Sequence, residues 1–368
     1  MGTRRSRWLI SAAAFLMGLA GIGLAAAFVT TASGAAAAPS ATSSSGTISE
    51  AGSSLLLPLM QKWAIAYHQQ VPGVTVNTAG GGSSTGISDA ADGTKDVGAS
   101  DAYLSSGDVL VHPGLLNIPL AVSAQSVIFN LPNLQGTNIK LSATVLAEMY
   151  SGQITMWNDP QIKALNGGVP LPAIRVAPLH RVEGSGDTFI FTSYLSTQDQ
   201  AWNTAAGYGT LVNWPSIPAA QAVVGSSGMI SGCEKTVGCV GYNGISYLSQ
   251  EQAGGLGEAA LQNGGGRYLT PSPATIQAEL DKFIAITPPN ETIAMIAGPG
   301  GYGYPIINYE YAIVKTDQPS AAAAEQVKDF LHWVISSPAA TSLVTSVGFQ
   351  PLPSDVQKLS QAQIKEIR

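Results

Sequence analysis

Residues 174–195, IRVAPLHRVEGSGDTFIFTSYL, run from an apolar segment through a turn of glycine and serine into an aromatic segment. The apolar residues around Ile174 and Val176 predict a strand, and the run from Phe189 to Leu195 predicts a helix. A strand joined to a helix by a short turn is the repeating unit of α/β proteins. We therefore predict an α/β fold that carries Arg181 in this turn.

The same design occurs twice more near the start of the chain. In residues 50–55, EAGSSL, the turn leads into a helix whose apolar residues recur every three or four positions from Leu56 to Tyr67. In residues 79–86, AGGGSSTG, the turn follows a strand-like segment. Ser53 or Ser54 is placed to cap the first of these helices.

The three turns together indicate an anion-binding site. The first turn of a helix offers unpaired backbone N–H groups and a partial positive charge, and serine adds a hydroxyl donor. Glycine in the turn lets a ligand approach the backbone closely. Arg181 can also hold an oxyanion through two parallel hydrogen bonds. The alternative for Arg181 is a surface ion pair with Glu183.

Asp101 bears on which anion such a site accepts. It follows VGAS, residues 97–100, at the expected end of a strand, where ligand sites of α/β proteins lie. A carboxylate can accept a hydrogen bond from phosphate, which keeps a proton at neutral pH, but it only repels sulfate. A site built for a hydrogen bond can reject an analogue that lacks it by about 10⁴–10⁵. The alternative is that Asp101 is a helix cap or a turn residue.

Composition excludes several classes of protein. The 368 residues are 45% hydrophobic and only 11% charged, with 41 glycines and 22 prolines. The charged fraction is less than half of the usual ~25%, which excludes a coiled coil and a charge-driven disordered chain. A net charge of −6 without a basic stripe argues against general nucleic-acid binding. The length allows about two domains.

The N-terminus has the order of a secretory signal. Three arginines precede an uncharged run over residues 8–29, and small residues follow. Because that run is long enough to cross a bilayer, residues 1–38 are either a cleaved signal peptide or a retained anchor. Residues 39–47, PSATSSSGT, predict a flexible linker. Without residues 1–38 the chain keeps 14 basic and 23 acidic residues, a net charge of −9.

Cys233 and Cys239 are the only cysteines and bracket a short loop. An exported protein meets oxidising conditions, so we expect a disulfide between them, with two free thiols as the alternative. The four histidines show no metal-ligand spacing near either cysteine. We expect no metal and no cofactor.

Several segments, in order along the chain, resemble the substrate-binding protein of the high-affinity phosphate ABC importer. The similarity runs from about Ile48 to the C-terminus. The segments that carry it are AGSS at 51–54, GGSSTG at 81–86, GASD at 98–101, MYSG at 149–152 with WNDP at 157–160, and GSGDTF at 184–189. The loop at 233–239 and YPIINY at 304–309 resemble the Gram-positive, cell-envelope branch of that family.

The resemblance implies the two-lobed periplasmic-binding-protein fold of type II, in which phosphate is buried between lobes joined by a two-segment hinge. It implies one lobe of residues 48–119 plus 304–368 and another of residues 120–303. By motif position, it assigns a hydroxyl donor to Ser54, a backbone donor to Leu55, a further serine to Ser83, the proton acceptor to Asp101, the clamp to Arg181, and the last donor turn to Ser185, Gly186 and Asp187.

Three positions depart from the pattern of the family. Leu55 stands where an aromatic residue is common, but only its backbone should contact the ligand. Glu183 stands where aspartate is frequent and is expected to hold Arg181. Asp187 stands where a threonine donor is common, and a carboxylate cannot donate. Asp187 therefore either turns away or accepts a second proton from phosphate.

The function implied is capture of phosphate without chemistry, so the protein is not expected to be an enzyme. Its expected partners are inorganic phosphate and the membrane permease subunits of an ABC importer, with no nucleic acid. We expect a monomer outside the cytoplasm, either associated with the cell membrane or secreted.

Two other functions stay open. Residues 82–86, GSSTG, match the G-x-S-x-G nucleophile elbow, which would make the chain a serine hydrolase with Ser84 as nucleophile. Such an enzyme needs a late histidine, and His332 is the candidate, although we interpret it as structural. The second alternative is a binding protein for another oxyanion, such as sulfate or molybdate, against which Asp101 argues.

Overall fold

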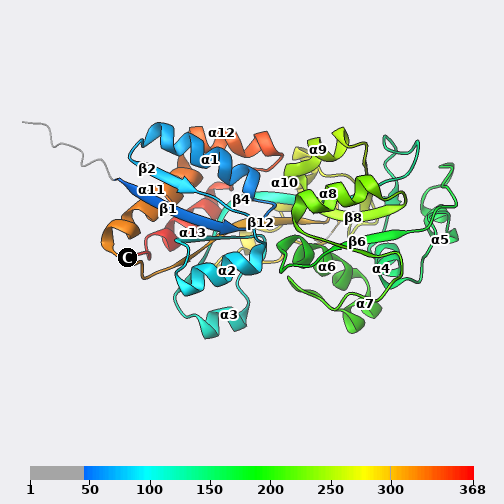
Figure 1. Ribbon diagram of the computed structural model, residues 1–368, viewed down its shortest axis with the longest axis horizontal. Coiled ribbons are helices and arrows are strands. Elements are labelled where there is room, and N and C mark those ends of the chain that lie inside the picture. The colour runs from blue at the N-terminus through cyan, green and yellow to red at the C-terminus, as the bar shows by residue number, and fades with distance from the viewer. Residues whose placement is uncertain (1–44, 299) are drawn as a thin grey trace, which may run out of the picture. The chain divides into compact units, whose positions relative to one another are not determined.

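The computed structural model describes residues 45–298 and 300–368 (Figure 1). The first third contains β1 (Gly46–Gly52), α1 (Leu57–Gln70), β2 (Val74–Asn77), α2 (Ser83–Asp92), β3 (Val97–Ser100), α3 (Ser106–Val111) and β4 (Leu115–Phe129). The middle contains β5 (Lys140–Leu141), α4 (Ala143–Ser151), α5 (Pro160–Leu165), β6 (Ala177–Arg181), α6 (Gly186–Gln198), α7 (Gln200–Ala205), β7 (Gln221–Val223), α8 (Gly225–Lys235) and β8 (Cys239–Gly244). The last part contains η1 (Ile245–Tyr247), α9 (Leu248–Ala253), β9 (Gly257–Glu258), β10 (Ala260–Gln262), β11 (Tyr268–Leu269), α10 (Pro273–Leu280), η2 (Ile284–Ile286), β12 (Ile307–Lys315), α11 (Ala321–Ser336), α12 (Pro338–Val344), η3 (Thr345–Val347) and α13 (Ser354–Ile364).

The main sheet joins two sets of parallel strands through an antiparallel centre. Its strands follow the order β2-β1-β3-β12-β4-β8-β6-β7, with β9 paired to β4 beside this path. β1 is parallel to β2 and β3, and β6 is parallel to β7 and β8. β12 runs antiparallel to both β3 and β4, and β4 runs antiparallel to β8. A separate small sheet has the order β11-β10-β5. The predicted α/β class is confirmed.

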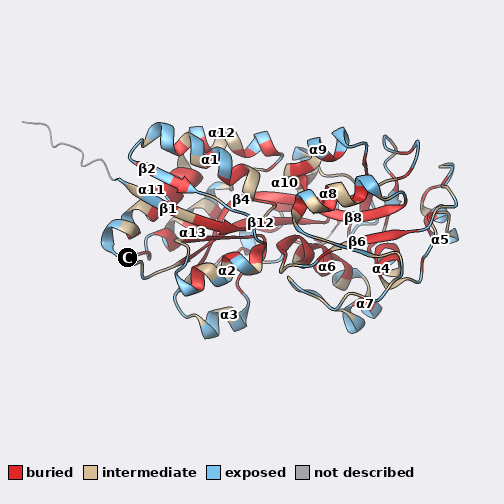
Figure 2. Cartoon of the chain, in the orientation of Figure 1, coloured by how far each residue is buried: buried red, intermediate tan, exposed pale blue. Residues whose placement is uncertain are grey.

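The long strand β4 links the two sets. Its first part, from Leu115 to Ala124, pairs with β12, and its last part, from Gln125 to Phe129, pairs with β8. All of its residues after Leu115 are buried (Figure 2). On the facing strand the register shifts between Glu310 and Tyr311. Such a bulge re-aims side chains and is frequent beside functional sites.

Helices cover both faces of the sheet (Figure 1). α1 packs on β2 and α2 on β1 and β3, whereas α8 packs on β6 and β8, and α6 on β8. This burial on both faces explains why β3, β4 and β8 are buried along nearly their whole length, whereas the edge strand β2 alternates between buried and exposed residues. The carboxyl ends of the parallel strands are followed by the turns that the sequence singled out.

Two glycines allow the first two turns to approach one another. Gly52 ends β1 at φ +142°, and a Cβ there would collide with the carbonyl oxygen of Ala99. Gly86 lies in α2, and its Cβ would collide with the same oxygen. Only glycine permits this contact between α2 and the strands β1 and β3.

Three local expectations need correction. The strand expected around residues 174–176 begins instead at Ala177, because pairing with β8 starts only there. Neither Ser53 nor Ser54 is the N-cap of α1, which is Leu56; the Ser53 hydroxyl accepts a hydrogen bond from the backbone N–H of Leu56 at 3.0 Å. The last two residues of the expected linker, 39–47, belong to β1. The rest of that linker, up to residue 44, and the signal or anchor at 1–38 lie outside the described residues.

The predicted disulfide between Cys233 and Cys239 is confirmed. It joins the last turn of α8 to the start of β8, with the two Cα atoms 5.3 Å apart. Among the helices of the described residues, none has the length and hydropathy needed to cross a membrane.

Candidate functional site

Arg181 is the last residue of β6 and only 2% exposed. Its backbone N–H donates to the Tyr242 hydroxyl on β8 at 3.1 Å, which fixes the end of the strand. The side chain therefore leaves the sheet at the carboxyl end of a parallel strand. This is the edge at which α/β proteins bind ligands.

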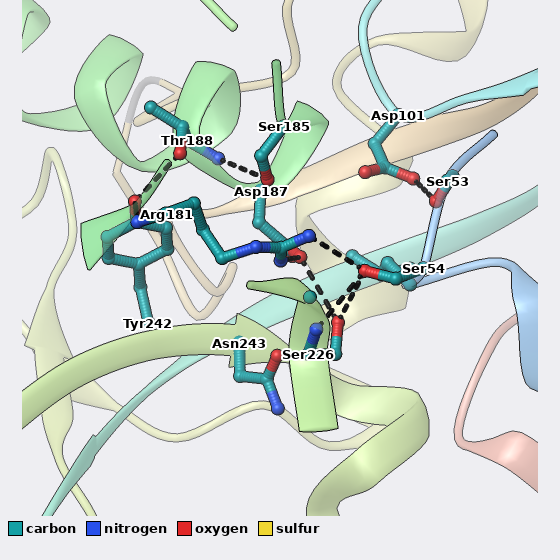
Figure 3. Close-up of polar contacts among 12 residues, drawn as sticks. Ser53, Ser54, Asp101, Arg181, Ser185, Asp187, Thr188, Ser226, Tyr242 and Asn243 are labelled. Atoms are coloured by element: carbon teal, nitrogen blue, oxygen red, sulfur yellow. Dashed lines mark hydrogen bonds and ion pairs between the residues drawn. The ribbon is translucent and has the colours of Figure 1, made fainter. Parts of the chain in front are cut away.

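Three side chains contact the Arg181 guanidinium, and two of them, Ser54 and Asp187, are labelled in Figure 3. Nη1 donates to Asp187 Oδ2 at 2.7 Å, Nη2 donates to Ser54 Oγ at 2.9 Å, and Glu183 forms a second ion pair. Burial alone would lower the pKa of Arg181, but its two carboxylate partners outweigh burial and raise that pKa. Arg181 is therefore a permanently charged clamp.

Asp187 does not turn away from the site. It is fully buried in the first turn of α6, and its Oδ1 accepts a hydrogen bond from Gln125 Nε2 at 3.1 Å. Burial raises the pKa of Asp187 to about 6; the charge of Arg181 lowers it and that of Asp101 raises it. The carboxylate of Asp187 therefore takes up a proton at mildly acidic pH.

Asp101 follows β3 and is 2% exposed. Its Oδ1 accepts from the Ser53 hydroxyl and its Oδ2 from the Ser83 hydroxyl at 3.3 Å. The backbone N–H of Asp101 donates back to Ser83 Oγ at 3.0 Å. Burial raises the pKa of Asp101, opposed by hydrogen bonds and by the charge of Arg181. The first two turns thus fix this carboxylate through a serine from each.

The second and third turns meet beside Asp101. A Cβ on Gly186 would collide with both Asp101 Oδ2 and Ser83 Oγ, so only glycine fits here. The backbone N–H of Ser84 donates to the carbonyl of Gly184 at 2.9 Å. Turns that are about 100 residues apart in the chain are therefore in direct contact.

Leu55 and Ser185 are held by other contacts. The Leu55 side chain is fully buried, and its carbonyl accepts from the Ser246 hydroxyl at 2.7 Å. Ser185 is the N-cap of α6, where its hydroxyl accepts from the Thr188 N–H at 3.3 Å. The structure therefore brings together the predicted site residues, which are Ser54, Leu55, Ser83, Asp101, Arg181, Glu183, Ser185, Gly186 and Asp187.

A fourth turn reaches the same place and was not predicted. Ser226, at the start of α8, is fully buried, and its hydroxyl lies 2.8 Å from Ser54 Oγ and 3.4 Å from Asp187 Oδ2 (Figure 3). The backbone N–H of Gly225 donates to Glu183 at 3.0 Å. The signal in the sequence is VGSSG, residues 224–228, which repeats the design of the other turns.

The structure does not favour the serine hydrolase. The Ser84 hydroxyl donates to Thr210 at 2.9 Å. His332 is exposed on α11, where it lines a separate surface hollow with Gln70 and Trp333. Ser84 and His332 do not form a nucleophile–base pair. Among the residues that the structure describes, no group of three or more His, Cys, Asp or Glu residues could hold a metal ion.

Most of this chain is similar to known proteins. A family model described as "PBP superfamily domain" matches residues 37–338. The phosphate-binding protein PstS of Methanocaldococcus jannaschii is 32% identical, with 84% of this chain and 83% of that protein covered. PstS of Pasteurella multocida is 31% identical, with 88% of this chain and 91% of that protein covered.

Solved structures agree on the fold. A high-affinity periplasmic phosphate-binding protein, solved with phosphate at pH 8.5, has a TM-score of 0.70 at 18% identity, covering 86% of this chain and 93% of that one. A phosphate-binding protein from Stenotrophomonas maltophilia has a TM-score of 0.67 at 18% identity, covering 86% and 94%. These likenesses confirm the predicted two-lobed fold.

Proposed function

This chain belongs to the PBP superfamily and matches proteins named phosphate-binding protein PstS over most of its length, and on that premise we propose that it binds inorganic phosphate and delivers it to an ABC importer. Binding involves no bond-making, so the protein acts as a receptor and not as an enzyme. The Gram-positive, cell-envelope branch of the family remains a prediction.

One observation carries the proposal: a buried arginine and a buried carboxylate acceptor occupy the same small site. Arg181 provides positive charge and parallel N–H donors for an oxyanion. Asp101 can only accept a hydrogen bond, so the ligand must bring a proton to it. Phosphate is an oxyanion that carries such a proton at neutral pH. The hydroxyls of two serines lie beside these groups: Ser54 accepts from Arg181 at 2.9 Å, and Ser83 donates to Asp101 at 3.3 Å.

The same two groups argue against the alternative oxyanions. Sulfate and molybdate carry no proton at neutral pH, so Asp101 would face them as an unpaired negative charge. Like charges brought together in a dry site are costly, because little solvent screens them. We therefore propose Asp101 as the residue that separates phosphate from these anions.

The ligand is proposed to lie between two lobes, residues 48–119 with 304–368 and residues 120–303. β4 pairs first with β12 and then with β8. This change of partner supports the proposal that the chain crosses from one lobe to the other within β4. The contacts of Arg181 with Ser54 and of Gly186 with Asp101 then join residues of different lobes. Closing the lobes would complete the set of donors around phosphate.

We propose further that the chain is exported through its N-terminal segment and works as a monomer outside the cytoplasm, on the membrane or secreted. Its partners there are the permease subunits of the importer. The confirmed disulfide supports an oxidising compartment. Mass spectrometry of the native protein would identify the mature N-terminus and so decide between a cleaved signal and an anchor.

Calorimetry with phosphate and with sulfate tests the function. The protein is first unfolded, dialysed and refolded to remove bound anion. Phosphate is expected to bind tightly and sulfate at least about 10⁴-fold more weakly. Equal binding of both would support the general oxyanion receptor instead, and absence of phosphate binding by a correctly refolded protein would rule the proposal out.

A further inference from the structure

A second buried acid lies directly behind Asp101. Glu310, on β12 beside the bulge, is completely buried, and its carboxyl group is in hydrogen-bonding contact with that of Asp101. Asn308 ties the two residues together, because its Nδ2 donates to the Asp101 carbonyl at 3.2 Å and to Glu310 Oε1 at 3.0 Å. No motif in the sequence assigned a role to Glu310.

The two oxygens of Glu310 have different surroundings. Oε1 accepts hydrogen bonds from Ser123 Oγ and from Asn308 Nδ2. Oε2 is buried and has no hydrogen-bond partner among the described residues when the carboxyl is taken as an acceptor. A buried oxygen without a partner is costly, whereas a hydroxyl at the same position could donate to Asp101.

Two carboxyl groups in contact and out of water cannot both be charged. Burial, and next the charge of Asp101, raise the pKa of Glu310 well above its ordinary value. Burial also raises the pKa of Asp101, but Ser53, Ser83 and the charge of Arg181 oppose that rise. The shared proton therefore belongs on Glu310, and Asp101 keeps the charge.

We propose that Glu310 is a neutral carboxylic acid that donates its Oε2 hydrogen to the Asp101 carboxylate and so positions Asp101 to accept the proton of the ligand. This inference rests on the proposed function, because phosphate supplies that proton. A carboxylate has about four lone-pair positions. Ser53, Ser83 and Glu310 occupy three of them, which leaves one for the ligand.

The arrangement predicts a dependence of binding on pH that acts through Asp101. Losing the Glu310 donor destabilises the charged form of Asp101 and raises its pKa, so Asp101 is protonated and stops accepting at a higher pH. The other charged and titratable groups that face this pair are Arg181, Asp187, Tyr247 and Tyr311. Burial raises the pKa of both tyrosines, so neither ionises near neutral pH.

Two substitutions separate this role from a structural one. Glu310→Gln keeps an N–H donor toward Asp101 and a carbonyl acceptor for Ser123 and Asn308. It should therefore bind phosphate within about threefold of the unmodified protein, with the same pH profile. Glu310→Met keeps the volume but loses the donor. It should bind phosphate at least about tenfold more weakly, and the acid limb of its binding curve should move to higher pH.

Infrared difference spectra test the protonation itself, independently of binding. The Glu310→Gln protein should lack one protonated carboxylic acid band that the unmodified protein shows at neutral pH. The matched control is Glu291→Gln. Burial raises the pKa of Glu291 to about 8, and its partners are Ser360 and Gln363, away from the site. This control should lose its own band and leave phosphate binding and its pH profile unchanged.

Three results would overturn the inference. Tighter phosphate binding by Glu310→Gln would mean that Glu310 is charged and repels the anion. An infrared spectrum without the loss of a protonated acid would mean the same. An unchanged pH profile in a folded Glu310→Met protein would mean that Glu310 does not act through Asp101. Failure of the unmodified protein to bind phosphate would count against the proposed function, and the infrared comparison would still test Glu310.

Discussion

Ser54 Oγ accepts a hydrogen bond from Arg181 Nη2 at 2.9 Å, so the first turn of the chain meets an arginine 127 positions later. This contact joins residues that the proposed lobes separate. The guanidinium of Arg181 and the hydroxyl of Ser54 are therefore already aligned with one another.

Replacing the clamp should abolish tight binding. In Arg181→Ala the carboxylates of Asp187 and Glu183 lose their partner and would face the incoming anion directly. Phosphate affinity should fall by at least about a hundredfold, measured by calorimetry. Arg267→Ala is the matched control, because Arg267 lies over the ring of Tyr302 at 4.2 Å and has no part in the site. Near-native affinity of a folded Arg181→Ala protein would refute the site.

Asp187 should give binding a dependence on pH. Its pKa is about 6, so above that pH it is ionised and can accept a second proton from phosphate. Affinity should therefore weaken as the pH rises above the second pKa of phosphate and the anion loses that proton. In Asp187→Thr, which restores a donor, this weakening should disappear. Calorimetry between about pH 6 and about pH 8.5 measures it. A flat profile in the unmodified protein would mean that Asp187 accepts nothing from the ligand.

Gly186 should be required for the close approach of the turns. In Gly186→Ala the added Cβ meets Asp101 and Ser83, although alanine itself favours the helix that begins here. We expect at least about tenfold weaker phosphate binding, and a free energy of unfolding lower by about 1–3 kcal/mol because the added Cβ overpacks a buried site. Gly136→Ala is the control, since a Cβ added at that position would have no other atom within 4 Å. Equal affinities of the two variants would contradict the packing described for Gly186.

The disulfide should stabilise the fold without affecting binding. It joins two cysteines only six positions apart in the sequence, one near the C-terminal end of α8 and the other at the start of β8. For so short a loop the chain-entropy model gives about 2 kcal/mol. The double replacement of Cys233 and Cys239 by serine should lower the free energy of unfolding by at least this amount in urea titrations, because both positions are buried and the serine hydroxyls add a desolvation cost. Phosphate affinity should stay the same, and a loss of affinity would mean that the disulfide positions Ser226 at the other end of α8.

Much of the site could be predicted from the sequence, because local patterns of glycine, serine and apolar residues mark the turns that form it. The turns around Ser54, Ser83 and Arg181 each combine glycine and serine ahead of an amphipathic helix, and all three meet in the structure. The assignment of Asp101 rests on its place after a strand of small residues. The first and last residues of a strand are harder to predict from the sequence. Ile174 and Val176 are apolar like a strand, yet pairing of β6 with β8 begins only at Ala177.

Two parts of the site could not be predicted for physical reasons. Ser226 follows β7, a strand of three residues that is mostly exposed and so lacks the apolar signal of a core strand. Glu310 sits between Tyr309 and Tyr311 in a strand whose pattern predicts only packing. Its contact with Asp101 depends on the pairing of β12 with β3 and on a bulge, and both are properties of the tertiary fold.

The pairing of Arg181 with Asp187 and Glu183 affects how other anions compete for this site. A bare arginine in a pocket would be occupied by whichever small anion is most abundant, such as chloride. Here the protein supplies its own counter-ions, so an incoming anion gains little from charge alone. An anion that leaves water for this site loses the free energy of its hydration. Only an anion that also donates a hydrogen bond to Asp101 gains enough to offset that loss. The acidic chain can thus scavenge a scarce nutrient from surroundings rich in competing ions.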